Sequence, residues 1–359
     1  MSDPMTRATW RAQVVEVPLE PDLPIIDAHH HLWPGPMPPP MEAYDVDSFL
    51  SDKMECGHNI VATVFVEANA RYRTGGPISL RPVGETEFAE QVGRDADRWG
   101  GRAAGVCAAI IAQADMMLGD AVEDVLIAHH EASPDRLRGI RYLAAWDPDF
   151  PGVMPGSRPG ILAEPSFRAA FARLAAHGLS YDAWVLHPQL AELAELAGAF
   201  PDTRIVLDHV GTPMGTGRYA GGGREGFDEW RRGLGKVAVH PNVVLKLGGL
   251  NMPVTGLGAP RDVPKPWSSR RIAEAQGDSL LTAIDIFGPS RCMFESNFPV
   301  DRLATSAGLL WNSFKRVARR FSTEEKADLF SGVAAHTYRL DLGRFVSPVV
   351  ATVDETRPA

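Results

Sequence analysis

The feature that most constrains the fold is a unit that recurs along the chain. Each unit is a short apolar run of strand length, and most are followed by a segment with helical spacing. Continuous apolar runs of this length are typical of strands buried on both faces, as in parallel sheets. The eight runs span residues 25–29, 60–68, 103–111, 137–144, 180–186, 203–210, 242–249 and 292–298. Helix-like segments follow at 84–99, 119–132, 163–178, 187–200, 224–239, 268–288, 305–321 and 322–338.

Eight strands alternating with eight helices predict an α/β fold of the (β/α)8 TIM-barrel type. A doubly wound open sheet is the structural alternative, but no glycine-rich phosphate loop follows the first strand. The length of 359 residues suits one barrel domain. We expect an N-terminal arm at 1–23, the barrel at 24–343 and a C-terminal tail at 344–359.

Three long loops rich in Pro and Gly follow predicted strands, at residues 33–45, 146–160 and 251–267. The C-terminal face of a TIM barrel carries the chemistry, so these loops are candidate walls of a substrate site. Their Pro and Gly residues can equally serve only to shape turns.

Charge and composition restrict the partners. A formal net charge of −9 argues against general binding of nucleic acid or anionic membranes, which favours excess Lys and Arg. We expect no signal peptide and no membrane span, because no apolar stretch approaches ~20 residues. The three cysteines form no CxxC pair, which suggests core thiols in a reducing cytoplasm. We expect a small-molecule substrate; the sequence leaves a homo-oligomer open.

The segment DAHHH, residues 27–31, ends the first predicted strand. Alternate side chains on a strand share a face, so His29 and His31 are expected to point together and His30 away. Two imidazoles on one face can bind one metal ion or one oxyanion. Asp27 has the same spacing and could orient an imidazole. A packed polar strand end is the structural alternative.

Other polar residues lie within or just after later strands. Glu295 inside a barrel is costly unless paired, so it either forms a structural pair with Lys246 or serves a metal or proton transfer. Glu67, at the end of the second strand, either contacts metal or substrate or is simply solvated. His187 follows the fifth strand, as a third imidazole or as an ordinary helix N-terminal residue.

Five segments, taken in order, resemble the metal-dependent-hydrolase-like branch of the amidohydrolase superfamily, which includes sugar-acid lactonases and the pyrone-dicarboxylate lactonase. The resemblance extends from about residue 24 to residue 340. The segments are IIDAHHHLW (25–33), LHPQL (186–190), LDHVG (207–211), KLGGL (246–250) and MFESNFPVD (293–301).

The resemblance implies roles for individual residues. His29 and His31 form the HxH pair of the active site, and His209 helps to bind or polarise the substrate carbonyl. Arg141 matches a position that binds substrate anions. The last strand of the family commonly carries an aspartate that activates water, and Asn297 replaces it here.

This replacement matters because an amide cannot accept a proton from water at neutral pH, whereas a carboxylate can. Asp301, in the same loop, could swing in as the base. Glu295 should share the inward face with Asn297. A bound metal could also generate hydroxide without a carboxylate base, or another reaction could have replaced hydrolysis.

We therefore predict a hydrolase of a small ester, a lactone or carboxylated cyclic ester, attacked by water at a polarised carbonyl. The loop aromatics Trp33, Tyr44 and Trp267 are candidates to shape its pocket. The alternatives are a lyase of the same superfamily, a decarboxylase or hydratase, or a barrel subunit that has lost hydrolytic activity.

The cofactor stays open at this point. A divalent metal, zinc first because imidazoles suit it, could bind His29 and His31 with His187 or His209. A site without metal is the alternative, because some members of the branch that this chain resembles work without one.

Overall fold

The computed structural model describes residues 6–37, 40–150, 157–221 and 223–345. Most of the predicted C-terminal tail and the start of the predicted N-terminal arm lie outside these residues. Among the described residues, no helix combines the length and apolar character that crossing a bilayer requires.

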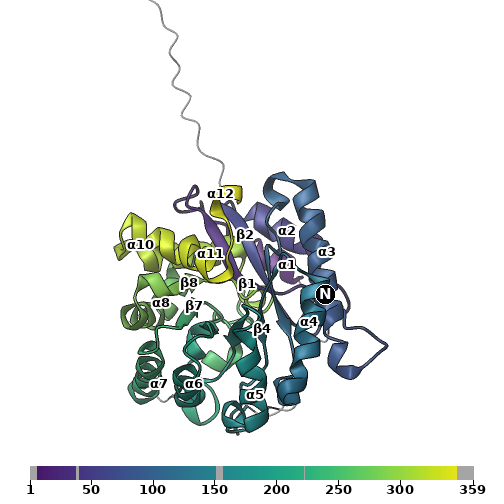
Figure 1. Cartoon of the computed structure of the whole chain (residues 1–359). Helices are drawn as coiled ribbons and strands as arrows, with labels where there is room; N and C mark the ends of the chain where they lie inside the picture. Colours follow the sequence, from purple (N-terminus) through teal and green to yellow (C-terminus); the bar gives the residue numbers. More distant parts are fainter. Residues whose placement is uncertain (1–5, 38–39, 151–156, 222, 346–359) are drawn as a thin grey trace, which may run out of the picture.

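Eight parallel strands pair in sequence order, and helices surround them (Figure 1). This confirms the predicted (β/α)8 TIM barrel. The strands are β1 Ile25–His30, β2 Ile60–Val66, β3 Ala109–Gln113, β4 Leu137–Arg141, β5 Ser180–Ala183, β6 Ile205–Leu207, β7 Val243–Leu247 and β8 Cys292–Phe294.

The ring of strands closes beside the histidines of β1. The backbone N–H of Asn297 donates to the carbonyl of His29 at 2.9 Å, and that of His31 donates to the carbonyl of Phe298 at 2.7 Å. The segment after β8 is therefore fixed against the end of β1 by main-chain hydrogen bonds.

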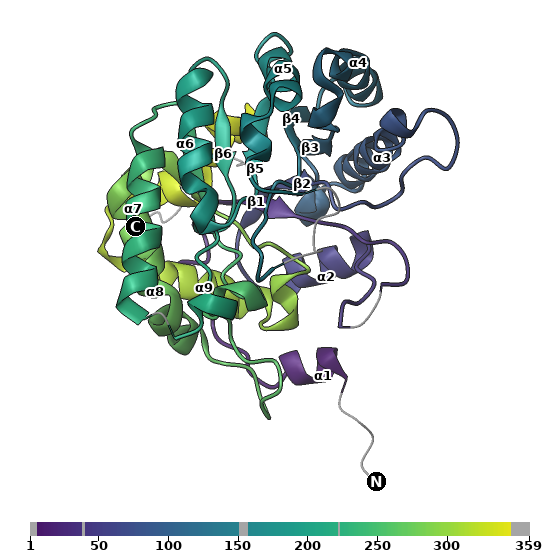
Figure 2. The ribbon, with the colours of Figure 1, turned by 90° about the horizontal axis from the view of Figure 1, so that it is seen from below.

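The outer helices follow the predicted segments, and Figure 2 shows α3 to α8 in an arc around the strands. The predicted helix at 322–338 is divided by a π-helical turn at Asp328–Gly332. The helices of the barrel layer are α3 Val83–Trp99, α4 Val122–Ala132, α5 Pro165–Leu174, α6 Leu190–Ala199, α7 Gly223–Ala238, α8 Ser269–Phe287, α9 Ala307–Val317, α10 Thr323–Ala327, α11 Val333–Tyr338 and α12 Leu342–Phe345.

Three helices were not predicted: the short α12 and two helices at the start of the chain. α1, Arg7–Arg11, lies in the expected arm, and the indole of Trp10 donates to the carbonyl of Val263 at 2.8 Å, so the arm packs on the barrel. α2, Val46–Glu55, precedes β2 and begins at Asp45, whose carboxylate accepts from the N–H of Ser48. Few apolar residues mark α2, because it buries only one narrow face.

The third strand also differs from its prediction, because β3 begins at Ala109 rather than near residue 103. A 3-10 turn at Gly101–Ala103 comes first, and Gly105 and Cys107, inside the predicted run, have φ values of +80° and +51°. A left-handed backbone cannot continue a strand, so β3 begins only after Cys107.

The barrel interior has an apolar layer with charged residues beside it. Inward side chains of the strands pack with α11 in one cluster that includes Ile26, Val64, Val244 and Tyr338. The hydroxyl of Tyr338 donates to Asp182 at 2.9 Å, which links this layer to the charged groups described next.

Candidate active site

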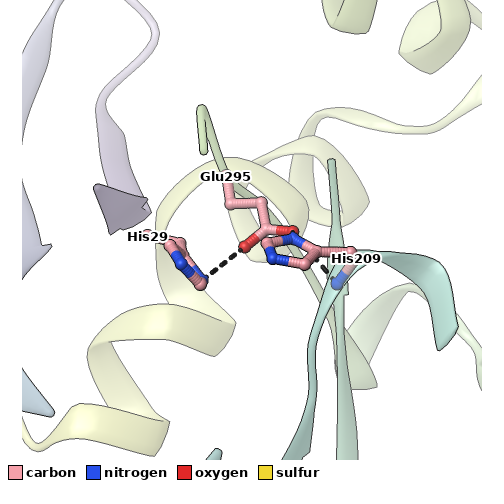
Figure 3. A group of neighbouring side chains, drawn as sticks. All are labelled: His29, His209 and Glu295. Carbon is pink, nitrogen blue, oxygen red and sulfur yellow. Dashed lines mark hydrogen bonds and ion pairs between the residues drawn. The ribbon is translucent and has the colours of Figure 1, made fainter. Parts of the chain in front are cut away.

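Three side chains from different strand ends converge inside the barrel: His29 from β1, His209 from the turn after β6, and Glu295 just after β8 (Figure 3). His29 Nδ1 lies 3.0 Å from Glu295 Oε2, and His209 Nδ1 lies 2.7 Å from Glu295 Oε1. One ligand atom from each residue falls within 4.8 Å of the others, which is the spacing of a potential metal site.

Two glycines of the KLGGL segment make room for this convergence. A Cβ at Gly249, whose φ is +66°, would meet His209 Nδ1 at 2.5 Å. A Cβ at Gly248 would meet the backbone oxygen of Glu295 at 2.4 Å and its Cγ at 2.5 Å. The site therefore requires glycine at both positions, in addition to the residues with chemical groups.

A buried charged layer touches the three residues. Lys246 on β7 donates to Asp182 at 2.6 Å, and its ammonium lies 3.0 Å from Asp208 and 3.2 Å from His29 Nδ1. The sequence left open a structural ion pair between Lys246 and Glu295. In the structure Lys246 pairs with Asp182 and Asp208 instead. Glu295 is instead the partner of the two histidines.

The electrostatics of this layer favour the charged forms of Lys246, His209 and Glu295. Burial instead raises the pKa of Asp182 and lowers the pKa of His29. Burial disfavours the Lys246 ammonium, but Asp182, Asp208 and Glu295 outweigh it and raise the pKa of Lys246 to about 12. Burial also opposes a charged His209, yet Glu295 raises the pKa of His209 above its usual value. Burial alone would raise the pKa of Glu295, but His209 and His29 lower it. A proton on His209 is therefore stabilised by the carboxylate beside it.

The histidines of β1 are arranged as the strand period predicts. His31 lies beside His29, with their Nε2 atoms 3.2 Å apart, and its Nδ1 is 2.8 Å from the carbonyl of Val66. His30 points away, 2.9 Å from the hydroxyl of Thr63. Asp27 accepts from the backbone N–H of Ser296 at 2.8 Å, so it braces the backbone after β8 rather than an imidazole.

Arg141 reaches the site from the end of β4. Its Nε donates to Glu67 Oε1 at 2.7 Å, its Nη2 donates to the backbone carbonyl of Glu67, and its Nη1 lies 3.5 Å from His29 Nε2. Glu67 is fully buried, which excludes simple solvation, and it does not line the cavity. Glu67 thus orients Arg141.

Asn297 is held by Asp301. The amide nitrogen of Asn297 donates to Asp301 Oδ1 at 3.0 Å, while Asp301 Oδ2 accepts from the backbone and side chain of Asn251 at 3.2 and 3.1 Å. Burial raises the pKa of Asp301 to about 6. With both oxygens engaged, Asp301 does not swing toward the cavity in this structure. It fixes the direction of the Asn297 amide.

Three predicted residues lie elsewhere. His187 Nδ1 accepts from the N–H of Met214 at 3.0 Å, and its ring packs on Tyr219, outside the His29–His209–Glu295 group. Tyr44 donates to Asp52 at 2.7 Å and pairs with Trp33 through the backbone, while the Arg271 guanidinium lies over the ring of Trp267. Neither aromatic is among the residues that line the cavity.

A cavity of about 350 Å³ opens over the site at the C-terminal ends of the strands. From the predicted set, five residues line it: His31, Trp33, Arg141, His209 and Asn297. Trp33 stacks parallel to His31, with ring centroids 5.9 Å apart. Residues from the ends of β1, β4, β6 and β8 therefore meet at one mouth, without the imidazole that was expected there from the end of β5, His187.

Sequence reasoning missed Asp182 and Asp208 in the charged layer, Asn251 beside Asp301, and Trp184 on the cavity wall. Asp182 and Lys246 each interrupt an apolar strand, so the alternation of β5 and β7 could have placed both inside the barrel. Asp208 directly precedes His209, and no local pattern marks its inward direction.

The residues present fit a bound cation. Glu295 Oε2 and both oxygens of Asp208 are buried and accept no hydrogen bond among the described residues, although the Lys246 ammonium lies 3.0 Å from Asp208 Oδ1 and His29 Nδ1 lies 3.0 Å from Glu295 Oε2. His29 Nδ1 also lies 3.2 Å from the Lys246 ammonium. If Lys246 donates to Nδ1, this nitrogen carries no proton, and two hydrogen-bond acceptors, His29 Nδ1 and Glu295 Oε2, face each other. A proton or a metal ion between them resolves this contact. Two imidazoles and a carboxylate are a donor set that zinc accepts.

A barrel with histidines, an arginine and a buried carboxylate at its C-terminal mouth defines a class of TIM-barrel enzymes. The chain belongs to the amidohydrolase family, whose model matches residues 26–340. It is an enzyme of the amidohydrolase superfamily, and its relatives support hydrolase or lyase chemistry in general.

Its relatives extend over most of the chain. The uncharacterised protein y4mH of Sinorhizobium fredii is 31% identical over 337 residues, 89% of this chain and 99% of that protein. L-fucono-1,5-lactonase of Burkholderia ambifaria is 31% identical over 209 residues, 55% of this chain and 64% of the lactonase.

Solved structures share the fold. An amidohydrolase from Burkholderia multivorans, with bound zinc, superposes with a TM-score of 0.67 at 24% identity, covering 88% of this chain and 99% of that one. A putative 2-pyrone-4,6-dicarboxylic acid hydrolase from Pseudomonas putida gives 0.60 at 16% identity, covering 89% and 98%.

Proposed function

We propose that this chain hydrolyses a lactone or another small cyclic ester by attack of water on the carbonyl. The observation that carries the proposal is the contact of His209 with Glu295 directly beneath the cavity. Two curated relatives that carry the name L-fucono-1,5-lactonase support the choice of a lactone.

The Glu295–His209 pair supplies the base that Asn297 cannot. Glu295 accepts the Nδ1–H of His209, which leaves Nε2 as the basic nitrogen of a ring that lines the cavity. When Nε2 takes a proton from water, the carboxylate stabilises the imidazolium, as in other histidine–carboxylate pairs. The same proton can then pass to the departing alkoxide.

Asn297 and Arg141 position the reactants. Because Asp301 accepts from the amide nitrogen of Asn297, the amide oxygen is free to accept from the attacking water and orient it. Arg141, held by Glu67, places positive charge at the cavity floor, where it favours a substrate carboxylate or the developing oxyanion.

A divalent metal, zinc first, fits the same three residues, His29, His209 and Glu295. It would be an alternative to the His209 base, because metal ligation uses the imidazole and carboxylate atoms that the base needs, and when bound it would act as a Lewis acid toward the carbonyl. Metal analysis of protein purified without added metal, followed by activity before and after chelation, tests this part. Full activity at negligible metal content would overturn it.

Acid release from a series of five- and six-membered lactones, followed with a pH indicator, tests the function. Glu295→Gln should lower kcat/KM by about 10²–10⁴-fold, the usual contribution of a general base. Glu225→Gln, on the exposed surface of α7, is the matched control and should leave kcat/KM unchanged. Hydrolysis that is absent, or equal in wild type and Glu295→Gln, would refute the proposal.

A decarboxylase or hydratase is the second candidate, and Asn297 is the observation that favours it. Decarboxylation needs no aspartate to activate water, so the amide at this position is no defect for such a reaction. Carbon dioxide release from small aromatic carboxylic acids, without lactone hydrolysis, would select this alternative.

A further inference from the structure

The walls of the cavity are mostly apolar although its floor is polar. Leu143 and Phe150 follow β4, Trp184 follows β5, Met252 and Val254 follow β7, and Val300 follows β8. Met252 and Val254 belong to a hydrophobic cluster separate from the main core, and Phe150, Trp184 and Val300 pack against it. Loops after four strands thus build one apolar wall around the mouth.

This wall offers few hydrogen bonds. Trp184 carries a polar atom, but its indole N–H donates to the hydroxyl of Thr212 at 3.1 Å. The remaining five wall side chains are hydrocarbon or thioether groups. A substrate hydroxyl placed against this wall would lose its hydrogen bonds to water without replacement.

The polar groups of the cavity occupy its floor and the sector after β1 and β2. His31, Arg141, His209 and Asn297 form the floor. Trp33 lines the β1 side with an indole N–H that is buried and has no hydrogen-bond partner among the described residues. Asn69 is exposed at the rim after β2. One polar end of a ligand is therefore accommodated, opposite an apolar remainder.

We propose that the substrate is an ester or lactone whose carbonyl end is polar and whose remaining part is hydrocarbon, either alkyl or aryl, rather than a polyhydroxylated sugar lactone. The proposal rests on the proposed function for the reaction, ester hydrolysis. The preference for an apolar ligand concerns binding, so it can be tested separately from hydrolysis. The cavity of about 350 Å³ holds a small monocyclic or bicyclic ligand.

Two six-membered lactones of similar size and opposite polarity test the proposal: δ-nonalactone and D-glucono-1,5-lactone. The comparison uses kcat/KM divided by the uncatalysed rate, because the two esters differ in intrinsic reactivity. We expect δ-nonalactone to be favoured at least about 100-fold, since each hydroxyl buried without a partner costs roughly tenfold to hundredfold. Equal values, or preference for the gluconolactone, would overturn the proposal.

A binding measurement separates this proposal from the proposed function. The lactams 3,4-dihydro-2-quinolinone and D-glucono-1,5-lactam mimic the two substrate classes without being hydrolysed as readily, and calorimetry compares their Kd values. Tighter binding of the quinolinone supports the inference even if no lactone is hydrolysed, in which case only the proposed reaction fails. Equal or tighter binding of the sugar lactam overturns it.

A near-isosteric variant locates the effect on the wall. Val254→Thr adds one hydroxyl to the wall and should lower kcat/KM for δ-nonalactone about three- to tenfold while leaving the gluconolactone unchanged or improved. Val239→Thr, at a position 72% exposed outside the barrel, is the control and should change neither. An identical response of both variants would overturn the assignment.

Discussion

Gly249→Ala tests whether the position of His209 sets the activity. A Cβ at residue 249 would lie 2.5 Å from His209 Nδ1, and ordinary contact begins near 3.4 Å, so the ring must retreat by about 0.9 Å (3.4 − 2.5). A misplacement of about 1 Å at a reacting group can cost about 100-fold in rate. We therefore expect kcat/KM for lactone hydrolysis to fall about 100-fold.

The same variant has a modest effect on stability. The φ of +66° at Gly249 costs a residue with a Cβ roughly 1–2 kcal/mol. For 359 residues, an unfolding entropy of about 0.75 kcal/mol per kelvin converts this to a fall in Tm of roughly 1–3 °C. The protein should thus stay folded at assay temperature.

Gly235→Ala is the matched control. Gly235 lies within α7, and a Cβ there would meet no atom within 4 Å. Alanine is favoured over glycine by about 1 kcal/mol in a helix, so this variant should be slightly more stable and fully active. If Gly249→Ala is folded and as active as Gly235→Ala, the reasoning about His209 is refuted.

Other variants test the charged layer and the Asn297 amide. Lys246→Met should destabilise the fold by about 3–5 kcal/mol in urea unfolding, because Asp182 and Asp208 lose their cation, and Lys246→Met/Asp182→Asn should recover part of the loss. With the pKa of Asp301 at about 6, above its unfolded value, this group lowers stability as pH rises from about 4 to 6. Protonation of Asp301 releases the Asn297 amide, and protonation of His209, whose pKa Glu295 raises, removes the base, so the lactonase rate should fall as pH drops. Asp301→Asn should lower the rate throughout and keep only the limb that His209 sets. Because Glu295 and His209 supply the base, Asn297→Asp should not raise lactonase activity, either alone or combined with Asp301→Asn, which removes the carboxylate facing it; a marked rise in the double variant would contradict this account.

The sequence predicted the barrel and the orientation of its first strand. Buried parallel strands read as apolar runs, and the period of two placed His29 beside His31 and turned His30 away. His209 and Glu295 could be chosen as candidate site residues because they follow their strands at the C-terminal face, where TIM barrels carry their active sites.

The pairing of charges was not predictable from the sequence. Lys246 could face Glu295, Asp182 or Asp208, and only the closed barrel decides between them. The role of Asp301 depended on the direction of its carboxylate, which the hydrogen bonds from Asn251 and Asn297 fix. The helix at Val46–Glu55 was missed because its buried face is narrow, although Asp45 marks its start.

The most direct test of the account is hydrolysis of δ-nonalactone in ¹⁸O-labelled water, followed by mass spectrometry of the product. The account predicts the hydroxy acid with one labelled oxygen in its carboxylate, formed far faster by the wild-type protein than by Glu295→Gln. Formation of the acid no faster than in the absence of protein, or at the same rate by both proteins, would contradict the claim that His209 and Glu295 activate water for ester hydrolysis.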